Sequence, residues 1–290
     1  MIISVASGKG GTGKTTVAVS LALSQKVPVT LLDCDVEEPN AALFLQLVDR
    51  SERAVTVPVP VIDESKCIAH NANGACGECA RFCEFNAIVH IGTSVMAFHE
   101  LCHSCGGCAL VCPTQAISEV QSPIGTLLTA RVANRPEKRS ITFAQGTLEV
   151  GKALSPPVIR EVRSLAAPDG LTIIDCPPGT SCPMSTAVSG TDYVVLVTEP
   201  TPFGLHDLRL AVETVRKMGI PCGVIINRST NGDGRVQKYC AKQGIPVLME
   251  IPEDRKIAEG YSRGLPLVEC ASEYRSDFAQ LPERITRSMP

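Results

Sequence analysis

The sequence predicts an α/β protein with a doubly wound, mostly parallel sheet and a smaller α+β module inserted into it. Short apolar runs alternate with helical patterns along most of the 290 residues. This alternation is typical of parallel strands that helices cover on both faces. Between about Val55 and Pro123 the helical periodicity disappears, and Cys, Gly, His and Asn dominate. We therefore assign residues 1–56 and 123–290 to the sheet domain and residues 57–122 to the insertion.

The apolar runs and the helical patterns place the elements of the sheet domain in order. We expect strands at Met1–Ala6, Val27–Asp33, Leu127–Val132, Ser140–Phe143, Leu171–Asp175, Tyr193–Thr198, Gly223–Asn227 and Pro246–Ile251. We expect helices at Thr15–Gln25, from Asn40 to about Val48, and at Pro156–Ala167, Gly204–Met218, Arg235–Gln243 and Arg255–Arg263. In such a sheet a ligand binds at the carboxyl ends of the strands.

Composition limits the classes of partner. A formal net charge of −3 provides no general attraction to nucleic acid. No apolar run approaches the ~20 residues that span a bilayer, and the first residues leave no room for a signal peptide before the first strand. The stretch Ser272–Pro290 lacks the basic amphipathic pattern that binds membrane surfaces. We therefore expect a cytoplasmic protein that binds no nucleic acid and does not insert into membranes.

A glycine-rich loop follows the first expected strand and precedes the first expected helix. Its residues Gly8–Thr15 fit the phosphate-loop pattern of two glycines, a lysine and a threonine. The glycines let backbone N–H groups converge on phosphate oxygens, and the helix adds the positive end of its dipole. In this pattern Lys14 neutralises the terminal phosphates, and the Thr15 hydroxyl ligates Mg²⁺. The expected nucleotide-binding residues of the loop are Gly8, Lys9, Gly10, Gly11, Thr12, Gly13, Lys14, Thr15 and Thr16.

An ordinary phosphate loop does not need the second lysine, Lys9. The segment Ser7–Thr16 reads Ser-Gly-Lys-Gly-Gly-Thr-Gly-Lys-Thr-Thr. It resembles the loop of the MinD/Mrp/ParA-like ATPases, the deviant Walker A motif of SIMIBI-type P-loop NTPases. The resemblance implies that the chain binds and hydrolyses ATP with Mg²⁺ in a dimer bridged by ATP, either a homodimer or a heterodimer with a paralogue. In that family the extra lysine reaches the partner's nucleotide, so Lys9 joins Lys14 among the expected catalytic residues.

Acidic residues follow two of the expected strands. The segment Asp33-Cys-Asp-Val-Glu-Glu-Pro-Asn40 matches a switch segment of the same family. The resemblance implies that Asp35 orients or deprotonates the attacking water and contributes to Mg²⁺ binding, while Asp33 holds Mg²⁺ through water. Asp175 ends an apolar strand, where phosphate-loop enzymes place the acid that organises the metal. Gly179 would then offer its N–H to the γ-phosphate. Strand-end aspartates also serve as helix caps, which is the alternative interpretation.

The resemblance extends to the region that binds the base. In the family an asparagine after a later strand reads the adenine edge, and this chain has Asn227 and Arg228 there. Pro252 and Glu253 open the segment that would pack around the base. Asparagine after a strand is also a common turn residue, so this assignment depends on the order of the motifs along the chain.

The insertion contains two cysteine runs. The second run, Cys102-x₂-Cys105-x₂-Cys108-x₃-Cys112-Pro113, matches the ligand spacing of bacterial-type ferredoxins. The first run, Cys67-x₈-Cys76-x₂-Cys79-x₃-Cys83, keeps the last two spacings. The segments 83–88 and 112–117 also share the pattern Cys-x-x-x-Ala-Ile. These parallels indicate a duplicated half in which each copy gives one isoleucine to a shared core.

In two-cluster ferredoxins the fourth cysteine of each run ligates the other cluster. The match therefore implies one [4Fe–4S] cluster on Cys67, Cys76, Cys79 and Cys112, and a second on Cys83, Cys102, Cys105 and Cys108. A pair of zinc sites is the alternative, although tetrahedral zinc usually takes two separated ligand pairs. We expect the spacer Ile68–Ala75 to expose or reshape the first cluster. Of the six remaining cysteines, Cys34 and Cys176 lie in the switch segments and Cys182 closely follows the second of them. These three would hold metal or cargo at a dimer interface if they are not simply free thiols.

The sequence supports one leading functional hypothesis and two alternatives. An ATPase with an inserted two-cluster ferredoxin domain would couple its nucleotide state to electron transfer or metallocluster assembly for an acceptor protein. The first alternative is an ATP-dependent iron–sulfur or metal cluster carrier without redox turnover, although the Cys-x-x-Cys found near the end of many Mrp-type carriers is absent here. The second is a spatial organiser like MinD or ParA, which the missing membrane tail and modest charge disfavour.

Overall fold

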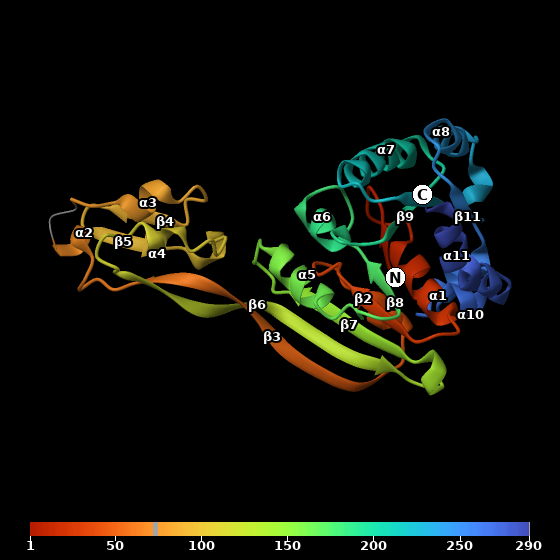
Figure 1. The fold of residues 1–290 in the computed structure, drawn as a ribbon, viewed down its shortest axis with the longest axis horizontal. Coiled ribbons are helices and arrows are strands. Elements are labelled where there is room, and N and C mark those ends of the chain that lie inside the picture. Colours follow the sequence, from red (N-terminus) through yellow and green to blue (C-terminus); the bar gives the residue numbers. More distant parts are fainter. Residues whose placement is uncertain (72–74, 290) are drawn as a thin grey trace. The chain divides into compact units, whose positions relative to one another are not determined.

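The computed structural model describes residues 1–71 and 75–289, which form two compact units (Figure 1). The first unit contains Met1–Arg53, Leu127–Thr147 and Val158–Pro290. The second contains Ala54–Thr126 and Leu148–Pro157. The second unit thus holds the cysteine runs together with a short later segment, 148–157, which the sequence did not group with them.

The first unit is built on a parallel sheet. The strand order is β11-β10-β9-β1-β8-β2-β7-β6-β3, and every neighbouring pair from β11 to β7 is parallel. The mostly parallel α/β sheet predicted from the sequence is therefore confirmed. The strands are β1 Ile2–Ala6, β2 Val29–Asp33, β3 Leu47–Ile62, β6 Ile117–Val132, β7 Ile141–Leu148, β8 Leu171–Asp175, β9 Tyr193–Thr198, β10 Cys222–Asn227 and β11 Val247–Ile251.

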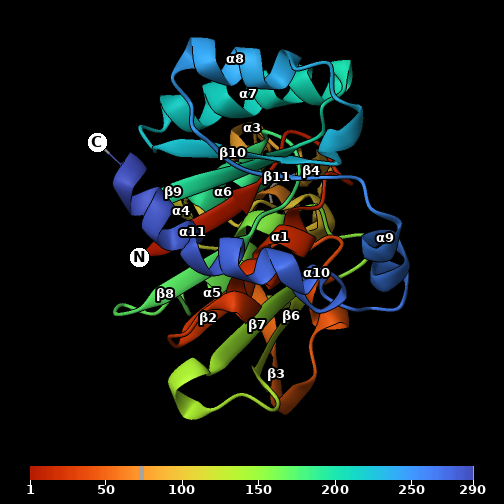
Figure 2. The same ribbon diagram turned by 90° about the vertical axis from the view of Figure 1, so that its right-hand side faces the viewer.

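Helices cover both faces of this sheet (Figures 1 and 2). On one face, α1 packs against α10 and α11, and all three share a buried cluster with alternate strand residues such as Ile3 and Val5. On the opposite face, α6 contacts β1 and α7 contacts β9. The helices are α1 Lys14–Ser24, α5 Ser155–Arg163, α6 Cys182–Val188, α7 Pro202–Lys217, α8 Arg235–Gln243, α9 Arg255–Ser262, α10 Leu267–Cys270 and α11 Arg275–Ser288. Short 3₁₀ turns lie at Ala41–Phe44, Glu137–Arg139, Ser229–Asn231 and Ser272–Tyr274.

The second unit has a small core of its own. Its elements are the later part of β3, α2 Ile68–Asn71, α3 Glu78–Phe82, α4 Gly107–Leu110, the antiparallel pair β4 Ile88–Ile91 and β5 Ser94–Ala97, and the first part of β6. Ile88 and Ile117 lie in the same buried cluster, as the duplicated motif predicts. Cys67 and Cys79 are also buried in that cluster. Cysteine sulfur therefore makes up a large share of this core, and a group bound by these cysteines would contribute to the stability of the unit.

The structure differs from the sequence expectations around the insertion. The segment after Asn40 forms only the 3₁₀ turn Ala41–Phe44, so the helix expected to reach about Val48 is wrong. From Leu47 onward the chain is strand β3, in which Val55, Val57 and Val59 are buried at every second position. The boundary drawn between residues 56 and 57 falls inside this strand. β6 and β7 are likewise longer than the short strands expected at 127–132 and 140–143.

The last helix, α11, was missed because its charged residues obscure a regular apolar stripe. Phe278, Leu281 and Ile285 are fully buried at helical spacing. They pack against α1, the helix that follows the glycine-rich loop. α1 is apolar around most of its circumference, so it needs a partner on the side that faces away from the sheet.

The packing of α11 predicts a large stability loss for Leu281→Ala. The substitution leaves a cavity beneath α1, and the free energy of unfolding should fall by about 3 kcal/mol. Urea unfolding followed by circular dichroism measures this change. Glu283→Ala, on the exposed side of the same helix, is the matched control and should change the free energy of unfolding by less than about 0.5 kcal/mol. Equal effects of the two substitutions would contradict this packing.

Candidate functional site

The glycine-rich loop connects β1 to α1 at the carboxyl edge of the sheet. Gly13 has a φ of 97°, and a Cβ there would lie 2.4 Å from Asn227 Nδ2. A Cβ on Gly8 would lie 2.2 Å from the backbone oxygen of Asp207 in α7. Both positions therefore require glycine, because the loop is packed between the end of β10 and the start of α7.

Lys14 and three aspartates gather at this edge. β2 and β8 are neighbouring parallel strands with Asp33 opposite Asp175 in the register. Lys14 Nζ lies 4.0 Å from Asp35 Oδ2, and only 6% of the Lys14 side chain is exposed. The parallel sheet thus brings together groups that are 142 residues apart in sequence, between Asp33 and Asp175.

Asp175 is the most poorly satisfied of these groups. Neither of its carboxyl oxygens makes a well-formed hydrogen bond to a described residue, and the side chain is fully buried. Burial raises the pKa of Asp175 to about 7, although Lys14 and the nearby Thr15 hydroxyl oppose the rise. Burial also raises the pKa of Asp35 to about 6, against the effect of Lys14. A buried carboxylate whose oxygens make no well-formed hydrogen bond and that lies beside further carboxyls is suited to bind a cation.

Asp33 has a different environment. One of its oxygens accepts a hydrogen bond from Asp35 N at 3.1 Å, and the other accepts from Asn40 N at 3.1 Å and Ala41 N at 3.0 Å. Burial and the nearby Asp175 raise the pKa of Asp33 well above its usual value. In this structure Asp33 shapes the loop that carries Asp35, and its expected contact to Mg²⁺ through water stays a prediction.

The second expected switch segment is Asp175–Gly179, which begins at the end of β8. Its Gly179 N donates to the Ser7 carbonyl at 3.0 Å, so the expected contact of this N–H with a γ-phosphate requires that bond to open. Cys34 and Cys176 are fully buried, and burial raises the pKa of both thiols, that of Cys176 to about 12. Both thiols are closed to solvent here, and a metal or cargo site on them at a dimer interface stays a prediction.

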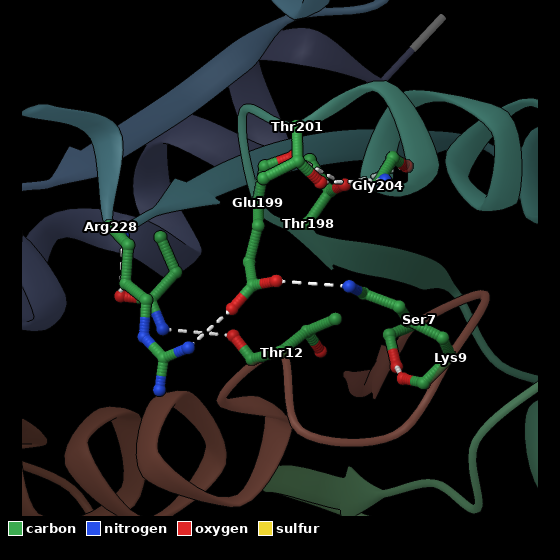
Figure 3. Close-up of polar contacts among 9 residues, drawn as sticks. Ser7, Lys9, Thr12, Thr198, Glu199, Thr201, Gly204 and Arg228 are labelled. Atoms are coloured by element: carbon green, nitrogen blue, oxygen red, sulfur yellow. Dashed lines mark hydrogen bonds and ion pairs between the residues drawn. The ribbon is translucent and has the colours of Figure 1, made fainter. Parts of the chain in front are cut away.

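The region expected to bind the base is tied to the glycine-rich loop by two connections (Figure 3). Asn227 Nδ2 donates to the Thr12 carbonyl at 2.8 Å. Glu199, directly after β9, pairs with Lys9 Nζ at 3.0 Å and with Arg228 Nη1 at 2.7 Å. Glu199 therefore links the extra lysine of the loop to the residue after Asn227.

Pro252 and Glu253 follow β11. The backbone N–H of Glu253 donates to the Thr230 hydroxyl at 2.9 Å, in the turn that follows Arg228. This contact joins the two chain segments that were expected to surround the base. Their contact with a nucleotide remains a prediction.

The cysteine runs of the second unit surround two cavities, and each cavity combines both runs. Cys67, Cys76 and Cys79 of the first run line one cavity together with Cys112 of the second. Cys102, Cys105 and Cys108 line the other cavity together with Cys83. Residues 72–74 of the long spacer lie outside the described residues, so the expected effect of Ile68–Ala75 on the first site stays a prediction.

Backbone N–H groups already point at some of these sulfurs. Ala87 N donates to Cys83 Sγ at 3.3 Å, and Ala116 N donates to Cys112 Sγ at 3.2 Å. Asn86 and Gln115, at equivalent positions before these alanines, both have a left-handed backbone with φ near 52° and 53°. The duplicated motif therefore has the same local geometry in both copies. Such N–H···S bonds stabilise thiolates and tune iron–sulfur clusters.

Burial raises the pKa of two of these thiols, Cys79 and Cys108, the latter to about 11. Ligation would therefore displace a proton from each. Among residues 1–71 and 75–289, no three His, Cys, Asp or Glu side chains converge on a point where they could hold a single metal ion.

Residues 3–267 match the family described as the CobQ/CobB/MinD/ParA nucleotide-binding domain. The chain belongs to this family. The matched range contains the glycine-rich loop, both strand-end aspartate segments and residues of every strand of the parallel sheet.

Two relatives in this family align along most of the chain. An uncharacterized protein of Methanocaldococcus jannaschii is 29% identical over 269 residues, which cover 91% of this chain and 90% of that protein. An iron-sulfur cluster carrier protein of Pyrococcus horikoshii is 27% identical over 284 residues, covering 92% of this chain and 78% of the carrier.

Solved structures of the family share the fold. The cell division ATPase MinD of Pyrococcus furiosus superposes with a TM-score of 0.55 at 24% identity, over 99% of both chains. MinD of Pyrococcus horikoshii, complexed with Mg-ADP, superposes with a TM-score of 0.54 at 23% identity, over 98% of this chain and 95% of that one.

In the described part of the chain, no helix combines the length and apolar character needed to cross a membrane.

Within this family context, Glu199 is the residue that the sequence reasoning missed. It follows an apolar strand at the carboxyl edge of the sheet, and the same rule had selected Asp175. Its partners Lys9 and Arg228 are 190 and 29 residues away in sequence, so no local pattern connects them. A search for every acidic residue directly after a predicted parallel strand would have found it.

The buried aspartates predict that the nucleotide-free chain loses stability as the pH rises. Between about 3.8, the ordinary pKa of an aspartate, and about 7, the folded chain keeps a proton on Asp175 that the unfolded chain has released. The free energy of unfolding therefore falls across this range, by about 1.4 kcal/mol for each unit of pKa difference. Asp175→Asn should flatten the fall, because an amide does not titrate.

Thermal unfolding from pH 4 to pH 8, in buffer free of divalent metal and nucleotide, measures this effect. Asp169→Asn, in an exposed loop of the same unit, is the control and should keep the wild-type pH dependence. An Asp175→Asn variant with an unchanged pH dependence would show that Asp175 does not carry the effect.

Proposed function

We propose that this protein is an ATP-hydrolysing iron–sulfur protein. Its nucleotide state would be coupled to electron transfer or metallocluster assembly for an acceptor protein. The observation that carries the proposal is the crossed cysteine arrangement, in which three cysteines of each run meet the fourth cysteine of the other. The same chain contains the phosphate loop and the buried acids of an ATPase family.

The nucleotide part of the proposal rests on the loop and the acids beside it. The loop N–H groups and Lys14 would hold the phosphates of ATP, while Thr15, Asp35 and Asp175 would hold Mg²⁺, which draws charge from the phosphate oxygens. The unsatisfied, fully buried oxygens of Asp175 fit this role. Asp35, with a pKa raised to about 6, is suited to accept a proton from the attacking water near neutral pH.

The iron–sulfur part rests on the chemistry of the donors. Eight cysteines in two sets of four match the ligand requirement of two [4Fe–4S] clusters, which store and pass single electrons when bound. The N–H groups of Ala87 and Ala116 would donate to the ligating sulfurs Cys83 and Cys112. Such donors favour the reduced, more negative state of a cluster.

The coupling would use the order of the segments along the chain. The cysteine module is inserted between the two switch segments, 33–40 and 175–179. In the proposed ATP-bridged dimer both segments respond to the γ-phosphate. A ligand changes an equilibrium only when it binds the two states unequally, so ATP would alter docking of the acceptor through these segments.

A cluster carrier without redox turnover is the second candidate. It is favoured by the relatives named iron-sulfur cluster carrier proteins, of which the Pyrococcus horikoshii protein aligns over 92% of this chain. Transfer of clusters to an acceptor lacking them, without any reductant, would favour this candidate. Reduction of an acceptor with the clusters retained would favour electron transfer.

Anaerobically purified protein should contain about eight iron and eight sulfide per chain, from two four-iron clusters. Cys105→Ser should retain about four of each, because Cys105 belongs to only one set. Iron and sulfide assays with electron paramagnetic resonance measure this. Cys182→Ser, at an exposed cysteine outside both sets, should keep about eight. A colourless, iron-free wild type, or zinc in place of iron, would refute the iron–sulfur part.

Lys14→Ala and Lys9→Ala should each reduce ATP hydrolysis by at least about a hundredfold, because each removes a cation expected to neutralise phosphate charge. Only Lys14→Ala should also weaken nucleotide binding to the single subunit, since Lys9 acts on the partner's nucleotide. Phosphate release and equilibrium binding of fluorescent ADP separate the two effects. Lys26→Ala, at an exposed lysine, should be normal in both assays. An active Lys9→Ala would remove the action across the dimer.

A further inference from the structure

Glu199 pairs with Lys9 of its own subunit, whereas the proposed function requires Lys9 to contact the nucleotide of the partner subunit. We propose that Glu199 is a positioning residue that competes with the partner's phosphates for Lys9, and thereby sets the protein concentration at which the ATP-bridged dimer forms. The inference deepens the proposed function and depends on its dimer. It assigns a role to a side chain that the sequence motifs do not mark.

The geometry of the pair favours a defined contact over a chance surface ion pair. Lys9 Nζ lies 3.0 Å from Glu199 Oε2, and only 12% of the Glu199 side chain is exposed. Among the described residues, no other side chain pairs with Lys9. Ion pairs of this kind, with one partner mostly removed from water, are stronger than fully exposed pairs.

The carboxylate of Glu199 is presented by a rigid backbone. A Cβ on Gly204 would lie 2.2 Å from the Glu199 carbonyl oxygen, so the start of α7 packs closely on this residue. Thr198 Oγ1 donates to the Gly204 carbonyl at 3.0 Å, and Thr201 Oγ1 accepts from Gly204 N at 3.0 Å (Figure 3). The backbone that carries the Glu199 side chain is therefore held by its own local contacts and not by Lys9.

The lysine side of the pair has open space beside it, although the Ser7 hydroxyl donates to the Lys9 carbonyl and holds the backbone there. Lys9 is followed by Gly10 and Gly11, and a Cβ at either glycine would meet no atom within 4 Å. One third of the Lys9 side chain, 33%, is exposed. The tip of the loop therefore has room to turn Lys9 away from Glu199 toward solvent or a second subunit.

Arg228 lowers the energetic cost of separating Lys9 from Glu199. It pairs with the other oxygen of Glu199 at 2.7 Å, so the carboxylate keeps one cation after Lys9 departs. A mostly buried carboxylate left without any partner would carry a large penalty. The three groups thus form a reversible latch: Glu199 retains Lys9 in the single subunit, and the partner's phosphates take it in the dimer.

The latch predicts a gain of dimerisation when the carboxylate charge is removed. Glu199→Gln should lower the protein concentration for half-dimerisation by about five- to tenfold, since two lysines are released in each dimer. The measurement is sedimentation velocity over a concentration series, with Mg²⁺ and a non-hydrolysable ATP analogue. A general structural defect would raise this concentration rather than lower it. Asp233→Asn, which removes an acid paired with Arg235 outside the latch, is the matched control and should keep the wild-type value.

A second readout tests the contact without nucleotide or dimer. Trace acetylation with acetic anhydride, quantified at Lys9 by mass spectrometry, should rise severalfold in Glu199→Gln because the ammonium loses its partner. It should fall in Arg228→Ala, because Glu199 then has Lys9 as its remaining partner. The exposed Lys26 is the internal reference in every sample.

These outcomes separate the latch from the proposed function. Equal Lys9 acetylation in the wild type and Glu199→Gln would overturn the latch and leave ATP hydrolysis untouched. Raised acetylation with an unchanged or higher concentration for half-dimerisation would overturn the competition. A wild type that stays monomeric with the ATP analogue at every concentration would overturn the ATP-bridged dimer itself, and with it the role assigned to Glu199.

Discussion

The main constraint on the first unit is that it holds several carboxyl groups and one ammonium group together in a site largely closed to water. The parallel register of β2 and β8 places Asp33 beside Asp175, and Lys14 at the start of α1 faces the same space. Burial and mutual repulsion raise the pKa values of these aspartates. This arrangement opposes folding unless a cation relieves it. The surrounding sheet and the buried helix α1 supply the stability that holds it.

On the side of the glycine-rich loop that faces β9 and β10, specific polar contacts take the place of a cluster of like charges. Asn227 fixes the Thr12 carbonyl, and Glu199 joins Lys9 to Arg228. The loop is thus bordered by buried acids on one side, of which Asp175 makes no well-formed hydrogen bond within the described residues, and by a network of polar contacts on the other. Phosphates would meet the first through Mg²⁺ and would disturb the second by drawing Lys9 away. The two sides would therefore respond differently to the same ligand.

The second unit is constrained by the small size of its core. Its buried cluster contains few large apolar side chains and several cysteines, so sulfur occupies positions that Leu or Phe would fill in a larger domain. The duplicated motif gives each copy the same turn, with a left-handed residue before an alanine whose N–H meets a cysteine sulfur. Exchange of the fourth cysteine between the runs ties the two copies together.

The sequence by itself determined the parallel α/β class, the phosphate loop, the strand-end acids and both cysteine runs, because each depends on spacing within a short stretch of chain. It did not determine the strand β3, where alternating valines follow a charged stretch, or the helix α11, where charges surround a narrow apolar stripe. Only the tertiary structure revealed Glu199 between Lys9 and Arg228, and the two buried Asp175 oxygens that make no well-formed hydrogen bond within the described residues. Both depend on which strands become neighbours in the sheet, and pairing between distant segments leaves no mark in a local pattern.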